Sequence, residues 1–283
     1  MDYDVIVAGA GIAGSLAAAG ASKNGAKVLL LDRNDYTQVG KKTNWGWVCG
    51  DAVAKTHIDF IYKQIGLRLS EPVLDIEVDG VQVLSPDFTR KFQFEGAGYS
   101  LDRPKLAKVL VEFAKKNGAQ YLQHHEVEGP IIEGERVVGV YGRDEKGAQI
   151  KYRSKLVIDT LGIASTIRRK LPKNKYIENT ISTDDIESTG RYIMSFEPNG
   201  EDINYYDKKN ALIHLNQKLA PGGYGWVFPK TNGRINIGIG VEKKSLELRN
   251  QRLGKNDTLH KLIVVSTNAF HASNPEGFFG YFK

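Results

Sequence analysis

The chain has 283 residues, of which 41% are hydrophobic and 25% are charged, so it can bury a sizeable core in one large domain or two interleaved ones. Its net charge of +6 comes from 39 basic and 33 acidic side chains spread along the chain, which argues against nucleic-acid binding. One cysteine excludes an internal disulfide, and the lack of a signal peptide or a long apolar segment predicts a cytoplasmic protein.

The first predicted unit is a strand, a helix and a second strand. Strands are expected at residues 4–8 and 27–32, with a helix at residues 12–22 between them. The helix is rich in alanine and other small residues, which lets it lie close on a sheet, and Gly25 marks its end. The chain therefore begins with a β-α-β unit.

Further along the chain, the predicted elements change from parallel to antiparallel. A helix is expected at residues 103–117, with Gly118 as its stop. A hairpin turning at residues 144–147 follows, and residues 155–162 have the pattern of a buried strand that returns to the first sheet. From Arg191 onward, short strands separated by Gly, Pro and Asn turns predict a second sheet. We therefore predict an α/β fold, a Rossmann-type domain with an interleaved, largely antiparallel sheet.

A glycine motif joins the first strand to the first helix. Gly9, Gly11 and Gly14 have the spacing G-x-G-x-x-G, and Asp32 follows at the end of the second strand. In this context the first glycine permits a tight turn, the second lets the backbone approach a pyrophosphate, and the third lets helix and strand touch. The N–H groups at the helix N-terminus would face the phosphates, and Asp32 would accept hydrogen bonds from an adenosine ribose. These residues predict a dinucleotide site.

The glycine motif alone does not separate a nicotinamide enzyme from a flavin enzyme. A nicotinamide dehydrogenase of this kind would continue with further parallel β-α-β units, whereas this chain continues into hairpins and a second sheet. The order of elements therefore favours a flavin.

A second unusual segment, residues 43–53, concentrates the scarcest residue types. The sequence TNWGWVCGDAV holds two of the three tryptophans and the only cysteine, Cys49. A lone cysteine is usually a small apolar packing residue. Composition alone thus fits packing as well as chemistry.

Four segments together resemble the geranylgeranyl reductase family, especially the archaeal flavoproteins that saturate the isoprenoid chains of membrane lipids. The first is the glycine motif with Asp32, and the second is CGDAV at residues 49–53, which resembles the family's cysteine-containing loop beside the flavin. The third, DTLGIASTIR at residues 159–168, is similar to the D-G-x-x-S-x-x-R element of the para-hydroxybenzoate hydroxylase fold, with the Asp-Gly pair interrupted. The fourth, residues 221–240, matches Y-x-W-x-F-P followed by G-x-G.

This resemblance implies FAD as the cofactor. The pyrophosphate would lie on the glycines, Arg103 would hold phosphate or polar flavin edges, and the backbone of Val127 would meet the adenine. Cys49 would assist as a thiol near the flavin or shape its pocket, and Asp51 would contact the flavin or turn the loop. The residues assigned to the cofactor by resemblance are Gly9, Gly11, Ala13, Gly14, Asp32, Arg33, Cys49, Gly50, Asp51, Ala52, Arg103, Val127, Asp159 and Gly162.

The resemblance also implies a reaction, the hydrogenation of isolated double bonds in geranylgeranyl chains of membrane lipids or their precursors. Tyr224, Trp226, Phe228 and Pro229 would line an apolar tunnel for the chain, although an aromatic sheet core has the same pattern. The implied electron donors are reduced ferredoxin, NAD(P)H or a deazaflavin, and a lipid substrate implies peripheral contact with a membrane. No metal site is expected. A flavin monooxygenase or halogenase of the same fold is the alternative enzyme.

The resemblance finally implies a division of the chain. Residues 1–75 and 98–170 would form the FAD-binding domain, and residues 76–97 and 171–245 the substrate-binding sheet. Family members continue with a second flavin-binding segment that carries a Gly-Asp pair, and none is found after Gly240. Residues 246–283 are therefore expected to be a truncated or divergent tail. The non-enzymatic alternative is a truncated nucleotide-binding fragment that binds flavin weakly or not at all.

Overall fold

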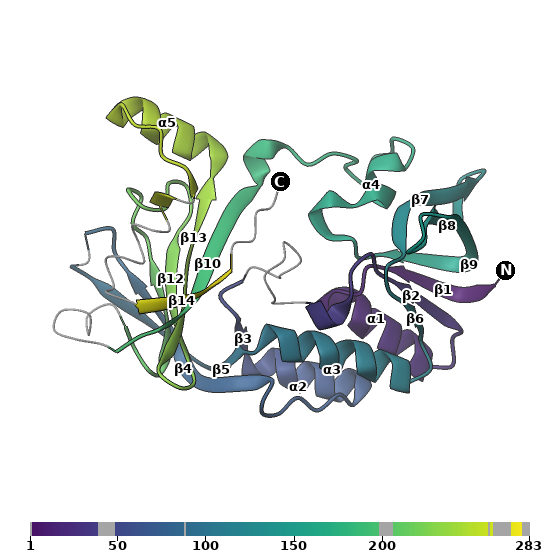
Figure 1. Cartoon of the computed structure of the whole chain (residues 1–283), viewed down its shortest axis with the longest axis horizontal. Helices are drawn as coiled ribbons and strands as arrows, with labels where there is room; N and C mark the ends of the chain where they lie inside the picture. Colours follow the sequence, from purple (N-terminus) through teal and green to yellow (C-terminus); the bar gives the residue numbers. More distant parts are fainter. Residues whose placement is uncertain are drawn as a thin grey trace. The chain divides into compact units, whose positions relative to one another are not determined.

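The computed structural model describes residues 2–38, 49–87, 89–197, 206–259, 261–262 and 273–278 (Figure 1). The chain divides into two compact units that alternate along the sequence. Unit 1 comprises Met1–Val39, Tyr62–Leu67 and Pro104–Ile181, and unit 2 comprises Gly40–Ile61, Arg68–Arg103 and Ser182–Lys283. Residues 43–48 of the tryptophan-containing segment lie outside the described residues.

Unit 1 is built on a six-stranded sheet in the order β6-β2-β1-β9-β8-β7. Its strands are β1 (Tyr3–Ala8), β2 (Val28–Leu31), β6 (Gln120–Leu122), β7 (Glu126–Glu133), β8 (Arg136–Arg143) and β9 (Gln149–Asp159). The pairs β1·β2, β1·β9 and β2·β6 are parallel, whereas β7, β8 and β9 form an antiparallel meander. Because β9 pairs with β1, the predicted return of residues 155–162 to the first sheet is confirmed.

Two helices cover one face of this sheet, α1 (Ile12–Lys23) and α3 (Arg103–Lys116). Alternate β1 and β2 side chains pack against small residues of α1 and against Val111 and Ala114 of α3. The opposite side chains of the same strands, including Ile6 and Leu29, pack against Val127 of β7 and Val140 of β8. Both strands are thus buried on both faces, as parallel strands usually are.

Short elements complete unit 1 and lead to unit 2. They are the 3-10 helices η1 (Tyr36–Gln38) and η2 (Gly162–Ala164), and α4 (Thr166–Lys170). Helix α2 (Lys55–Ile65) carries the chain from unit 2 into unit 1, and η3 (Thr183–Asp185) opens the last part of unit 2.

Unit 2 is built on an eight-stranded sheet in the order β14-β10-β13-β12-β11-β4-β5-β3 (Figure 1). Among its described strand pairs, β4·β11 is parallel and the others are antiparallel. The prediction of a second, largely antiparallel sheet is therefore confirmed. The elements are β3 (Ala52–Ala54), β4 (Leu74–Leu84), β5 (Lys91–Leu101), β10 (Glu187–Ser195), β11 (Asn210–His214), β12 (Gly225–Lys230), β13 (Arg234–Glu242), β14 (Ser273–Phe278) and helix α5 (Lys243–Leu253).

The two faces of the unit 2 sheet differ in character. Side chains alternate between the faces along each strand. One face carries an aliphatic core that includes Tyr192, Met194, Val227 and Ile237. The opposite face carries a smaller cluster of Ala211, Trp226 and Phe228, with Val81 and Ile213 packed against it. We call this second side the aromatic face, and it carries most of the predicted residues of unit 2.

Candidate functional site

The glycine loop of unit 1 brings helix α1 into contact with strand ends. Gly9 has a φ of +101°, and a Cβ there would lie 2.5 Å from the carbonyl oxygen of Thr160. A Cβ on Gly14 would lie 1.8 Å from the carbonyl oxygen of Gly9. A side chain at Gly9 would therefore push the loop away from the end of β9, and one at Gly14 would push α1 away from the end of β1.

Gly11 is different, because a Cβ there would meet no atom within 4 Å. It is the N-cap residue of α1, and no side chain caps the helix, so side chains leave the N–H groups of the first turn unsatisfied. Ala13 lies exposed in the same turn. The loop thus leaves room for a ligand at Gly11 and none at Gly9 or Gly14.

Asp32 ties the end of β2 to the glycine loop. One carboxylate oxygen accepts the N–H of Ala10 at 2.6 Å, and the other accepts the N–H of Asn34 at 2.7 Å. Burial raises the pKa of Asp32, and these two hydrogen bonds oppose the shift. Each carboxylate oxygen keeps further acceptor capacity, as recognition of a ribose hydroxyl would require.

The other predicted cofactor residues of unit 1 lie at or after the ends of β9 and β2 and in β7. Asp159 accepts the N–H of Leu161 at 3.1 Å and the hydroxyl of Ser165, which in turn caps α4. This closes the turn at Gly162, whose φ is +74°, although the Asp-Gly pair is interrupted. The carbonyl of Val127 accepts the Thr166 hydroxyl at 2.6 Å, and exposed Arg33 lies 3.9 Å from Glu126.

In unit 2, the Cys49 loop is fastened by Arg103. Its Nε donates to Asp51 Oδ1 at 3.0 Å, and its Nη2 donates to the sulfur of Cys49 at 3.0 Å. The backbone N–H of Asp51 also donates to that sulfur, at 3.4 Å. Asp51 adopts a φ of +73°, which turns the loop so that its N–H faces Cys49 while its carboxylate faces Arg103. Cys49 thus faces two N–H donors rather than an apolar core.

A second cation, Lys230, joins the same buried cluster. Its ammonium lies 3.6 Å from Asp51 and 3.2 Å from Asp75, and it donates to the Leu101 carbonyl at 2.6 Å. Burial raises the pKa of Asp75, but the Thr231 hydroxyl and the Lys230 charge outweigh it, and the pKa lies below its ordinary value. Two carboxylates and two cations therefore balance in charge.

Asn236 links this cluster to the aromatic face. Its amide nitrogen donates to the Cys49 carbonyl at 2.8 Å and to Asp51 at 2.9 Å, and its oxygen accepts the Trp226 indole N–H at 3.0 Å. Asn236 is fully buried, so its three hydrogen bonds are shielded from water. One side chain consequently fixes both the Cys49 loop and the tryptophan.

The three predicted aromatic residues lie together beside this loop. The ring centroids of Tyr224 and Trp226 are 6.2 Å apart, and those of Trp226 and Phe228 are 6.4 Å apart. The Phe228 ring covers Gly50, where a Cβ would lie 2.2 Å from the ring. Burial, Glu187 and Cys49 all raise the pKa of Tyr224, in that order. Ala52 begins β3 directly after the loop.

The structure does not bring Pro229 to this group. Because side chains alternate along β12, Pro229 points to the opposite side of the sheet from Phe228. Its register partner, Ile235, belongs to the aliphatic core.

The aromatic face continues well beyond the predicted residues. One row of register partners, each on a neighbouring strand, crosses the sheet. It consists of Arg191, Gly238, Trp226, Ile213, Val83 and Phe92. Five strand spacings make this row about 24 Å long. Its apolar part ends at Phe92, which is 52% exposed beside Phe94 at 60%.

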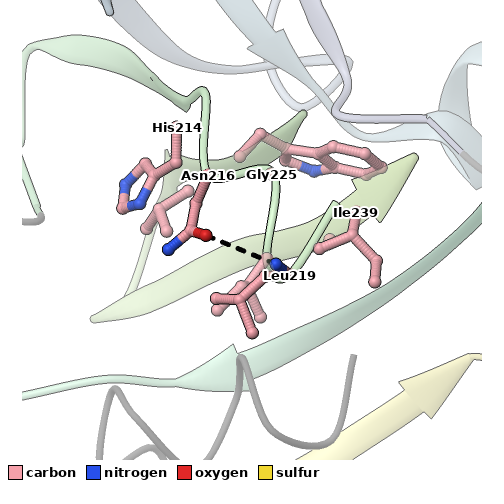
Figure 2. A pocket seen from close by; sticks show the side chains of 9 residues that line it. His214, Asn216, Leu219, Gly225 and Ile239 are labelled. Atoms are coloured by element: carbon pink, nitrogen blue, oxygen red, sulfur yellow. Dashed lines mark hydrogen bonds between the residues drawn. The ribbon is translucent and has the colours of Figure 1, made fainter. Parts of the chain in front are cut away.

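A pocket lies on the other side of the sheet (Figure 2). His214 and the loop residues Asn216 and Leu219 line it together with Ile237 and Ile239 of the aliphatic core. Burial, followed by the charge of Lys91, lowers the pKa of His214 to about 4. Trp226, a predicted substrate-binding residue, is among the lining residues, whereas none of the predicted catalytic or cofactor residues is.

Asn236, Lys230, Asp75 and Arg191 were not predicted from the sequence. Asn236 stands between two isoleucines in a strand that is mostly apolar and glycine, and Arg191 lies in the middle of β10. A polar residue at a buried strand position needs a partner, which is a signal that the pattern contained. Asp75 carried no such local signal.

Within the described residues, no group of three or more His, Cys, Asp and Glu side chains could hold a metal ion. Nor is any described helix long and apolar enough to cross a membrane.

Comparison with protein families gives two matches. Residues 4–167 match the family described as FAD dependent oxidoreductase, and residues 185–263 match the geranylgeranyl reductase catalytic domain. The glycine loop and Asp32 fall in the first match, and the aromatic strand with Asn236 falls in the second.

Individual relatives agree with these families. The digeranylgeranylglycerophospholipid reductase of Sulfolobus acidocaldarius is 29% identical over 86% of this chain, which spans 51% of that relative. The solved structure of a geranylgeranyl bacteriochlorophyll reductase-like protein from Thermoplasma acidophilum is similar with a TM-score of 0.72 and 26% identity, covering 89% of this chain and 61% of that one. The myxobacterial chondrochloren halogenase CndH shares the fold, with a TM-score of 0.68 at 19% identity, covering 89% of this chain and 56% of that one.

Proposed function

The chain belongs to the geranylgeranyl reductase family of FAD-dependent oxidoreductases, and from this we propose that it hydrogenates isolated double bonds in the geranylgeranyl chains of a membrane lipid or lipid precursor. It spans about half the length of the Sulfolobus relative, so the activity is proposed here on the residues present. The observation that carries the proposal is the position of Cys49 beside the aromatic face, where Arg103 and Asn236 hold it.

The unit 1 loop fits the phosphates of FAD. Open space at Gly11, the uncapped start of α1 and the acceptor Asp32 together make an anion and ribose cradle that serves no packing purpose. When bound and reduced, FAD would supply the hydride for one alkene carbon. The protein's own task is to align the alkene, exclude water and bring a proton to the other carbon.

We assign that proton to the thiol of Cys49. A thiol that gives its proton to an alkene carbon becomes a thiolate, and the Arg103 guanidinium and Asp51 N–H already point at the sulfur. These donors need no rearrangement to meet the new charge. Asn236 fixes the loop backbone, so the sulfur keeps its place relative to Trp226.

The aromatic face suits the rest of the substrate. A polyprenyl chain offers methyl and vinyl carbons and almost nothing to hydrogen-bond, so its recognition has to be apolar contact. The row from Trp226 through Ile213 and Val83 to Phe92 provides such contact along much of the sheet. We infer that the chain lies along this row.

The test is an anaerobic incubation of the dithionite-reduced, FAD-loaded protein with a geranylgeranylated glycerophospholipid. Mass spectrometry should show lipids that have gained one H₂ per saturated bond. Unchanged lipid, together with oxygen-dependent product formation from an aromatic substrate, would favour a monooxygenase or halogenase instead. Failure of the purified protein to take up FAD would exclude both enzymes and leave a nucleotide-binding fragment.

A further inference from the structure

Arg191 is a buried cation that the proposed reaction does not use. It lies in the middle of β10 and is only 5% exposed. Its Nε is shielded from solvent and has no hydrogen-bond partner. Across the described part of the chain, no hydrogen bond or ion pair reaches its guanidinium. Arginines are almost never buried this far without a partner.

The position of Arg191 in the sheet sets the direction of its side chain. Its neighbour Tyr192 belongs to the aliphatic core, so alternation along the strand puts Arg191 on the aromatic face. Across the ladder, Gly238 stands opposite Arg191 on one side and Trp226 on the other. A Cβ at Gly238 would lie 2.2 Å from the Trp226 ring, so the indole covers this glycine and extends toward β10.

Among the described residues, no carboxylate forms an ion pair with Arg191. Asp51 and Asp75 are balanced by Arg103 and Lys230, and Glu187, on the same face of β10, lies beside Gly240 and Tyr224. A buried and unbalanced guanidinium is costly in the folded protein unless an anion joins it. The described residues therefore include an unpaired positive charge in the same row as the apolar side chains from Trp226 to Phe92, with β14 on the other side of β10.

We propose that Arg191 binds the phosphate group of an amphiphilic ligand whose apolar chain lies along the row toward Phe92. The inference rests on the proposed function for the identity of the chain, and it adds a site for the head group. A guanidinium matches phosphate with two parallel hydrogen bonds, and the row presents its cation and its apolar side chains in the order that a prenyl phosphate or prenyl phospholipid would need.

The first arm of the test is thermal unfolding with inorganic pyrophosphate, which needs no redox activity. Pyrophosphate should raise the melting temperature of the wild-type chain and of Gly11→Ala, whose nucleotide loop is blocked. In Arg191→Gln that rise should be lost, and the melting temperature without pyrophosphate should increase because an unpaired buried charge is gone. Arg252→Gln, an exposed arginine on α5, is the matched control and should behave like the wild type.

The second arm identifies the source of the phosphate. Arg191→Gln should raise KM for a geranylgeranylated phospholipid about 10- to 100-fold, the range expected for a charged hydrogen bond, with kcat little changed. KM for the same lipid without its phosphate should stay as in the wild type, and Arg191→Lys should recover part of the loss. If KM rises for geranylgeranyl diphosphate and not for the phospholipid, the ligand is the diphosphate.

Two results would overturn the inference. One is a lower melting temperature of Arg191→Gln without pyrophosphate, which would mean a structural partner for the guanidinium. The other is a pyrophosphate-induced rise that survives in Arg191→Gln. A chain that reduces no alkene but loses the rise on substitution would refute the proposed function and leave this anion site standing.

Discussion

Cys49 gains its chemical meaning from the groups that touch it. The Arg103 guanidinium and the Asp51 N–H both donate to the sulfur, and Asn236 binds its carbonyl. A cysteine kept only for packing would lie among apolar neighbours. The polar surroundings instead suit a sulfur that changes charge during a reaction.

Replacing Cys49 by serine should keep the fold and slow alkene reduction. Serine retains a small hydroxyl that Arg103 can reach, but a hydroxyl is a far weaker acid than a thiol. We expect a fall of about 100-fold or more in the rate, the range for loss of a general acid. Single-turnover lipid reduction by the pre-reduced protein measures it, and an unchanged rate would return Cys49 to a packing role.

His214 predicts a pH dependence of stability. Burial and then Lys91 lower its pKa from 6.5 to about 4, so between these values the unfolded chain binds a proton that the folded chain does not. The free energy of unfolding should be highest above pH 6.5 and should fall as the pH falls toward 4, by up to about 3 kcal/mol from this residue.

Urea unfolding of the wild type and His214→Gln at several pH values isolates this contribution. The variant should lose less stability between neutral pH and pH 4 than the wild type, and His57→Gln, an exposed histidine on α2, should not differ from the wild type. Parallel profiles for the wild type and His214→Gln would show that His214 does not titrate differently on folding.

At the level of elements, ion pairs and side-chain hydrogen bonds hold the Cys49 loop to the sheet, in addition to the pairing of β3 with β5 directly after it. The Asp51 carboxylate forms ion pairs with Arg103 and Lys230 and accepts a hydrogen bond from Asn236. Removing one partner of a buried ion pair leaves the others uncompensated, which costs more than the pair itself contributes. Asp51 is thus the carboxylate that joins both cations to the loop.

Asp51→Asn should therefore destabilise unit 2 strongly. We expect a loss of about 3–5 kcal/mol in the free energy of unfolding, because Arg103 would lose its carboxylate partner and Lys230 would keep only Asp75. Asp59→Asn, which removes an exposed i,i+4 pair with Lys55, is the control and should change little. Equal effects of the two substitutions in urea unfolding would contradict the account of the cluster.

The turn between β1 and α1 yields a matched pair of glycine variants. A methyl group at Gly14 would collide with the Gly9 carbonyl, whereas a methyl group at Gly11 would meet nothing. Gly14→Ala should consequently lower the melting temperature, and Gly11→Ala should leave it unchanged while weakening FAD binding. Thermal unfolding and titration with FAD separate the two effects; equally tight FAD binding by Gly11→Ala would place the phosphates elsewhere.

For the whole molecule, the local sequence pattern predicted individual helices and turns, but it did not predict most contacts between distant residues. The helix expected at residues 12–22 is Ile12–Lys23, and that expected at residues 103–117 is Arg103–Lys116. Their periodicity and stop signals lie within the elements themselves. The glycine loop was equally accessible, because its three glycines and Asp32 lie within one β-α-β unit.

The polar cluster could not be read in the same way. Cys49 and Asn236 are 187 residues apart, and Asp75 and Thr231 are 156 apart. Only the order of strands in the sheet brings these residues together. No local sequence pattern predicts that β4 pairs with β11 in parallel. Pro229 is the opposite case. It is adjacent to Phe228 in the predicted motif, but side chains alternate along the strand and place it on the other face of the sheet.

Reduction of an alkene by bound FAD can be followed spectroscopically. The FAD-loaded protein is reduced under anaerobic conditions, freed of excess reductant and mixed with a geranylgeranylated phospholipid. The account predicts that the oxidised flavin spectrum returns with the lipid as the only oxidant, with one double bond saturated per flavin reoxidised. A bound flavin that stays reduced in the presence of the lipid would contradict it.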